Sequence, residues 1–268
     1  MHLRQPDVDA LLFSPFTNDH TRLEIVKIEG QNLKPPARDS KLKRRLKVRE
    51  RCSTARFALL GLCAVSATVY AGRPLTVDDA DVNVKGAGHV EVWAAHELTE
   101  SGVSRTLTVA PAFAPLEGVE LTAMLTRDQG NKTSLTSAQV KWRITATDES
   151  GCNFGATLAR ARSSENTNPS ATNFNALMSC NRSALGSLHL NLGGVNRSGE
   201  RASRTWGVAV ERLIGGVNLH VEQFGEERAK PTSQAGASIA LTKRLQLDGT
   251  IGRSGSNKIL SAGFKVGF

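Results

Sequence analysis

Residues 260–268 read Leu-Ser-Ala-Gly-Phe-Lys-Val-Gly-Phe and alternate between apolar and small or polar side chains up to the end of the chain. Successive side chains of a β-strand point to opposite faces of a sheet. One face of this stretch is therefore apolar, and its members are Leu260, Ala262, Phe264, Val266 and Phe268. The stretch predicts a terminal strand with one apolar and one polar face.

The same alternation recurs in eleven segments upstream. The predicted strands are 88–97, 103–112, 119–127, 136–147, 153–162, 172–181, 184–193, 203–212, 217–225, 233–243, 245–253 and 257–268. Their connections carry turn residues such as Gly215-Gly216, and no helical period interrupts the series. Parallel neighbours need crossovers of a dozen residues or more, so the predicted sheet is antiparallel.

The predicted connections alternate in length. Longer polar connections lie near 128–135, 163–171, 194–202 and 226–232, and short ones near 148–152, 182–183, 213–216 and 244. Short turns at one end and longer loops at the other are typical of transmembrane β-barrels with an even number of strands. We therefore predict an all-β, up-and-down, antiparallel transmembrane barrel of about 12 strands over residues 88–268.

The basic charge is concentrated before this region. Of the net charge of +9, residues 1–71 contribute +6 (13 basic, 7 acidic), and residues 72–268 contribute +3 (21 basic, 18 acidic). A nucleic-acid-binding domain spreads its cations over a folded face, so we expect no nucleic-acid partner. The basic stretch instead precedes the apolar run 57–70, which is too short to span a bilayer.

A basic stretch, an apolar core and small residues at an exit are the three parts of a secretory signal peptide. Val69 and Ala71 supply the small residues before a cleavage point at Gly72. We predict an extension over 1–47 that lies upstream of the true start or is disordered, a signal peptide over 48–71, and a periplasmic N-terminal segment over 72–87. A buried helix and an uncleaved membrane anchor are the alternatives for the apolar run.

The last strand resembles the C-terminal assembly signal of bacterial outer-membrane barrel proteins, with Phe264, Val266 and Phe268 as its residues. That resemblance implies export to the outer membrane of a Gram-negative bacterium. It also implies two partners, the outer-membrane lipid and the barrel assembly machinery.

A second resemblance covers the start of the mature chain. Residues 72–80 read Gly-Arg-Pro-Leu-Thr-Val-Asp-Asp-Ala, and residues 88–93 read Gly-His-Val-Glu-Val-Trp. Both resemble the meta-pathway phenol-degradation-like barrel family, in which an RP…TDDA stretch precedes a first strand with Gly and Glu. Val77 departs from that pattern by interrupting the Thr-Asp-Asp. The resemblance implies a porin-like passive channel or transporter for small molecules, whose solute the sequence does not identify.

Other functions stay open at this point. A barrel filled by its own side chains, with a structural or adhesive role, is the first alternative. A soluble periplasmic β-sandwich is the second, because the aromatic belts of membrane barrels are sparse here and Tyr70 is the sole tyrosine. A barrel hydrolase or acyltransferase is the third, suggested by Ser187 and His189. We nevertheless predict a non-enzyme with no catalytic, cofactor-binding or metal residues.

Two side-chain pairs follow from aligning the apolar faces of neighbouring strands. If Leu121 opposes Trp142, Glu120 lies opposite Arg143 as an ion pair in the lumen. If Cys152 opposes Cys180, apolar residues face apolar residues throughout that hairpin. We therefore also predict a Cys152–Cys180 disulfide, which an oxidising periplasm favours. Two unpaired, packed cysteines are the alternative.

Overall fold

The computed structural model describes residues 75–268 apart from 101, 131, 147–150, 165–169 and 183–185. The predicted extension, the signal peptide and the cleavage residues Val69, Ala71 and Gly72 lie outside the described residues. Within the described part of the chain, no helix is long and apolar enough to cross a membrane.

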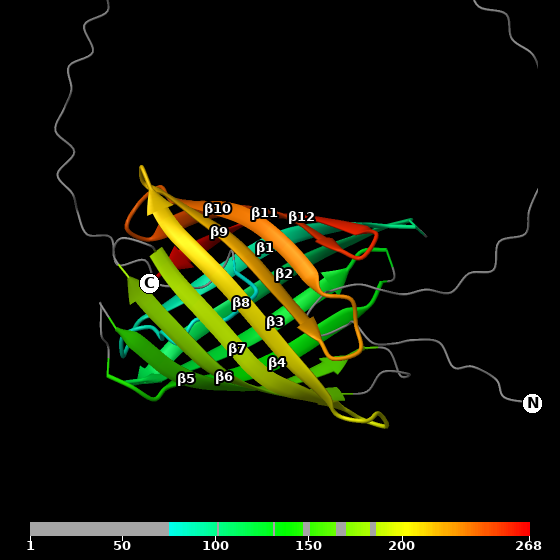
Figure 1. The fold of residues 1–268 in the computed structure, drawn as a ribbon, viewed down its shortest axis with the longest axis horizontal. Helices are drawn as coiled ribbons and strands as arrows, with labels where there is room; N and C mark the ends of the chain where they lie inside the picture. The colour runs from blue at the N-terminus through cyan, green and yellow to red at the C-terminus, as the bar shows by residue number, and fades with distance from the viewer. Residues whose placement is uncertain (1–74, 101, 131, 147–150, 165–169, 183–185) are drawn as a thin grey trace, which may run out of the picture. The chain divides into compact units, whose positions relative to one another are not determined.

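Twelve antiparallel strands form a closed barrel in which each strand pairs with its neighbours along the chain and β1 pairs with β12 (Figure 1). The strands are β1 (Gly88–Thr99), β2 (Gly102–Leu116), β3 (Val119–Asp128), β4 (Ser134–Arg143), β5 (Cys152–Ser163), β6 (Ser170–Arg182), β7 (Gly186–Arg197), β8 (Ser203–Ile214), β9 (Val217–Glu226), β10 (Thr232–Ala240), β11 (Leu245–Ser254) and β12 (Asn257–Gly267). The fold class predicted from the alternation is confirmed.

The alternation separates the two faces of the barrel wall. Apolar side chains such as Leu192, Ile251 and Leu260 point outward and are more than half exposed. Polar side chains such as Thr157 and Asn175 point into the lumen and are buried. An apolar outer face around a polar interior is the inverse of a soluble domain, and it suits a barrel that is surrounded by lipid.

The connections are short at both ends of the barrel, which differs from the predicted alternation. Strands β6 and β7 extend to Ser170 and Arg197, so they take up much of the predicted longer loops. Strand β4 ends at Arg143, earlier than the predicted residue 147. We call the end that carries Gly88 and Phe268 the terminal end, and the opposite end the distal end.

The last residue closes the barrel at the terminal end. The Phe268 amide donates to the Gly88 carbonyl at 2.9 Å, and the Gly88 amide donates to the Phe268 carbonyl at 3.1 Å. Phe264, Val266 and Phe268 are 39 %, 39 % and 61 % exposed on the outer face. The residues of the predicted assembly signal thus form one outward apolar row beside the β1–β12 seam.

The β5–β6 hairpin has the register that the cysteine alignment predicts. Cys152 is paired directly with Cys180, and Phe154 and Leu158 face Met178 and Phe174. The two cysteine Cα atoms are 4.0 Å apart, and the sulfurs form a disulfide.

The intact mass of unreduced protein should therefore show a single Cys152–Cys180 linkage, because the two sulfurs are bonded in the structure and an oxidising compartment keeps such a bond intact. Proteolysis before and after reduction, followed by peptide mass spectrometry, measures it. Substituting both cysteines by serine is the control, and it should leave the peptide masses insensitive to reductant. Two free thiols in protein purified from the envelope would contradict the linkage.

The predicted register of β3 and β4 is wrong by two residues. Val119 faces Trp142, and Glu120 faces Lys141. Arg143 instead donates to the Glu117 Oε1 at 2.6 Å, so the predicted Glu120–Arg143 ion pair does not form. A two-residue slip keeps every side chain on its own face, so the hydrophobic pattern does not distinguish the two registers.

Candidate functional site

Residues 75–87, which we call the lumen segment, lead from the interior of the barrel to the start of β1, and residues 77–83 lie within the lumen. Its most buried side chains are 0 to 8 % exposed, and they are those of Val77, Asp79, Ala80, Val82 and Asn83. The described chain begins at this segment, in cyan, before entering β1 (Figure 1). Residues 72–87 were predicted to form a periplasmic segment outside the barrel, and the entry of this stretch into the lumen was not predicted from the sequence.

Inward-facing side chains hold the backbone of the lumen segment. Glu222 of β9 accepts hydrogen bonds from the Thr76 amide at 2.9 Å and from the Val77 amide at 2.7 Å. The Ser179 Oγ of β6 accepts from the Ala80 amide at 2.8 Å. A buried irregular backbone needs partners for its amides, and here the barrel wall supplies them.

Glu120 of β3 holds the end of the segment that leads into β1. Its Oε2 accepts from the Asn83 amide at 3.0 Å and from the Asn83 Nδ2 at 2.7 Å. The two carboxylates that bind the segment, Glu120 and Glu222, therefore lie near its opposite ends. Both carboxylates lie on the lumen face, as the alternation along their strands predicts, and both accept hydrogen bonds from the chain's own backbone.

A buried ion pair fixes the middle of the lumen segment. The Lys141 Nζ lies 2.8 Å from the Asp79 Oδ1, and both side chains are at most 6 % exposed. The same oxygen accepts from the Asp81 amide at 2.8 Å. Burial alone raises the pKa of Asp79, but the Lys141 ammonium outweighs it and holds that pKa below its ordinary value. Removing one partner of such a pair costs about 3–5 kcal/mol.

Small residues of the wall make room for the lumen segment. Val77 packs with Ala209 of β8 and Phe224 of β9. A Cβ atom added to Gly207 would lie 2.8 Å from the Val77 Cγ2, and one added to Gly155 would lie 3.4 Å from the Ala80 Cα. The first distance is too short for two carbon atoms, so Gly207 gives Val77 the space that it occupies, and Gly155 lets the backbone at Ala80 lie close against the wall.

Further charged and histidine side chains of the strands point inward as well. Those buried on the inner face include Glu91, Lys141, Asp248, Lys265, His89, His189 and His220. Phe224 is 4 % exposed and packs inside against Val77. The inward face is thus charged in both signs, as the alternation predicts.

Ser179, His189 and Glu211 form a chain of hydrogen bonds that resembles a catalytic triad in composition. The Ser179 Oγ is 2.8 Å from the His189 Nδ1, and the His189 Nε2 is 3.4 Å from the Glu211 Oε1. Ser179 is 0 % exposed, and its hydroxyl already accepts from the Ala80 amide. This series of hydrogen bonds therefore supports the backbone of the lumen segment. The Ser179 hydroxyl is buried, so no substrate atom reaches it in this structure. Ser187, named with His189 in the sequence analysis, takes no part in it.

No group of three or more His, Cys, Asp or Glu side chains among the described residues is arranged to hold a metal ion. The features of the lumen are therefore a polar wall, a short segment that crosses it, and non-covalent bonds between the two. Hydrogen bonds or ion pairs to the lumen segment come from side chains of β3, β4, β5, β6, β7, β9 and β10. The residue of β10 is Gln234, whose Nε2 donates to the Thr76 Oγ1 at 2.9 Å.

Comparison with known proteins agrees with the fold. The family model described as "Uncharacterised conserved protein UCP029691" matches residues 58–262. No curated protein matches the sequence.

Among solved structures, the KdgM porin is similar with a TM-score of 0.54 and 14 % identity, over 66 % of this chain and 99 % of that one. The COG4313 outer membrane channel from Pseudomonas putida F1 has a TM-score of 0.54 and 12 % identity, over 71 % and 98 %. The NanC porin has a TM-score of 0.54 and 8 % identity, over 66 % and 98 %. At these identities the likeness concerns the barrel fold.

Proposed function

The chain belongs to the family described as uncharacterised conserved protein UCP029691, and we propose that it is an outer-membrane channel for small molecules that its own lumen segment closes. The single observation that carries this proposal is the position of the lumen segment, whose residues 77–83 lie in the lumen and are bonded to the inner wall. A polar interior inside an apolar outer face is the construction of a membrane channel.

The bonds that hold the lumen segment are reversible, which suits a gate. They include hydrogen bonds to Glu222, Ser179 and Glu120 and one ion pair to Lys141. Each such bond exchanges for a bond to water when the segment leaves, so its net contribution is limited to about 1.5–3 kcal/mol even where the acceptor is a carboxylate. Release of the segment would leave a polar passage lined by charges of both signs.

The solute is proposed as a class only. The resemblance of residues 72–93 to the meta-pathway phenol-degradation-like barrels favours a small molecule, and the barrel fold shared with the KdgM, NanC and COG4313 structures favours passive passage. A barrel closed permanently by the segment, with a structural role, is the second candidate, because the segment is so fully bonded.

Planar-bilayer recording of the purified full-length protein separates the two candidates. A channel gives discrete current steps that appear and disappear as the segment leaves and returns. A permanently closed barrel gives no steps at any voltage at which the bilayer itself stays intact, and that result would contradict the channel.

Gel migration of unheated and boiled protein, together with fractionation, tests whether the protein forms a closed barrel in the outer membrane. We expect unheated protein to migrate differently from boiled protein on denaturing gels, because a closed barrel has no edge strand from which to unravel. Fractionation should recover the shifted band with the outer membrane. Boiled protein is the control for the unfolded position. Identical migration of the two samples, or recovery with soluble periplasmic protein, would contradict the proposed location.

A further inference from the structure

The charged side chains of the twelve strands are divided between the two faces of the barrel wall. Among the strand residues whose side chains the structure describes, all eight carboxylates face the lumen, and eight of the twelve lysines and arginines face outward, such as Arg105, Arg162 and Lys258. Four cationic side chains therefore remain to balance eight carboxylates. With its histidines neutral, the inner wall carries a net charge of −4.

Three of the lumen carboxylates lie near the distal end, together with one cation. Glu97 of β1 and Asp128 of β3 are at most 4 % exposed on the inner face. Glu226 of β9 forms a two-bond ion pair with Arg197 of β7, with distances of 2.7 and 2.8 Å. The Arg197 charge is thus balanced within this pair, and Glu97 and Asp128 leave the distal part of the inner wall negative.

The other five lumen carboxylates lie between the middle of the barrel and the terminal end. They are Glu91, Glu120, Glu211, Glu222 and Asp248, and the cations of this part of the wall are Lys141, Arg143 and Lys265. Arg143 donates at 2.6 Å to Glu117, which belongs to the β2–β3 connection. Because Glu117 already balances that guanidinium, the carboxylate excess extends along the whole passage.

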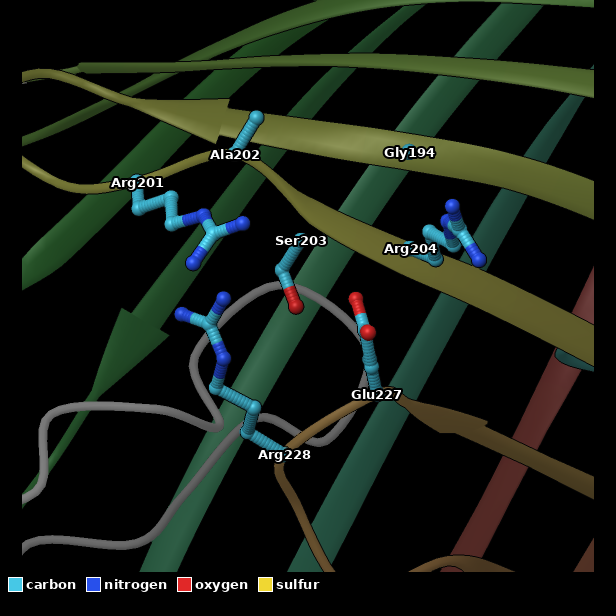
Figure 2. A pocket seen from close by; sticks show the side chains of 7 residues that line it. All are labelled: Gly194, Arg201, Ala202, Ser203, Arg204, Glu227 and Arg228. Atoms are coloured by element: carbon cyan, nitrogen blue, oxygen red, sulfur yellow. The ribbon is translucent and has the colours of Figure 1, made fainter.

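The basic residues of the distal end lie outside this passage. Arg201 and Arg228 belong to the β7–β8 and β9–β10 connections, beyond the strand ends, and with the outward-facing Arg204 they line a pocket of about 320 Å³ (Figure 2). Glu227 lines the same pocket. Cations in these positions do not reduce the negative charge along the inner wall.

We propose that the open lumen selects small cations over anions, so that the solute of this channel is a small, positively charged molecule or ion. A passage lined by one sign of charge between walls of low dielectric concentrates the opposite ions and repels like ones. Carboxylates lining a pore select cations in this way. The inference rests on the proposed channel function and adds the charge of its solute.

The reversal potential of the single-channel current under a KCl gradient tests the proposal. For wild-type protein at about 0.1 M salt, where the screening length is about 10 Å, we expect K⁺ to be at least about threefold more permeant than Cl⁻. The preference should weaken at about 1 M salt, where the screening length falls to about 3 Å.

The variant Asp128→Asn/Asp248→Asn should shift the K⁺ to Cl⁻ permeability ratio towards one, because it halves the net charge of the inner wall at nearly constant side-chain size. Each single variant should give an intermediate ratio. Glu227→Gln is the matched control, since it also neutralises one carboxylate but lies in an exposed connection outside the passage. It should keep the wild-type ratio.

The outcomes separate this inference from the proposed function. A wild-type current that Cl⁻ carries as readily as K⁺ overturns the cation selectivity and leaves the channel in place. An unchanged ratio in the double variant, in protein that keeps the heat shift, overturns the role of the lumen carboxylates. The absence of any current from the wild type overturns the channel itself, and the inference with it.

Discussion

The variant Glu222→Ala should conduct far more often than the wild type in planar bilayers. Glu222 accepts from the part-buried Thr76 amide and from the buried Val77 amide, and its loss leaves both donors without this acceptor. A hydrogen bond to a charged group contributes about 1.5–3 kcal/mol. Losing two of them should shift the equilibrium between the held and released segment by about 3 kcal/mol, or roughly 100-fold.

The control for this experiment is Glu97→Ala. Glu97 is another buried carboxylate of the inner face, but it accepts from the Asn257 Nδ2 at 2.9 Å, near the distal end. Its removal should leave the open probability close to that of the wild type. An unchanged open probability for Glu222→Ala, in protein that still shows the heat shift, would contradict the gating role of the lumen segment.

The variant Phe268→Ala should reach the outer membrane as a folded barrel at a small fraction of the wild-type level. Phe268 ends the outward row that resembles the assembly signal, and its backbone closes the seam with Gly88. The substitution keeps that backbone, so it tests the recognition of the side chain. The heat-shifted band in outer-membrane fractions is the measurement.

Phe174→Ala is the matched control, because Phe174 also points outward and is 51 % exposed, on β6 away from the seam. Both variants remove one phenyl ring from the lipid-facing surface, and therefore a similar amount of apolar area. A larger assembly defect in Phe268→Ala then reports recognition of the C-terminus. Equal amounts of the heat-shifted band for the two variants would contradict the predicted C-terminal assembly signal.

The sequence predicts the wall of the barrel because the wall depends on a local period. Side chains two residues apart share a face, so segments such as 184–193 are recognisable without knowledge of their partners. The β5–β6 register was predictable as well, because Cys152 and Cys180 single out one alignment among those that keep the apolar face. Between β3 and β4 no such pair exists, and the predicted alignment was two residues off.

The lumen segment was not predictable by the same means. It has no strand or helix period, and its position depends on contacts between residues far apart in the sequence, such as Thr76 and Glu222, 146 residues apart. Two signals were nevertheless available. The inward face of β9 carries a glutamate in a barrel interior, where a buried carboxylate needs a partner, and Gly155 and Gly207 leave space on the inward face.

The most direct test of a channel closed by its own segment is a reversible tether. A Cβ atom at Gly207 would lie 2.8 Å from the Val77 Cγ2, so the double variant Val77→Cys/Gly207→Cys places two thiols within reach of a disulfide. Single-channel current is recorded before and after reductant, with wild-type protein as the control for reduction of Cys152–Cys180. We expect the oxidised variant to be silent and to conduct after reduction. Equal currents in both states would contradict the account, because a tethered segment would then not close the barrel.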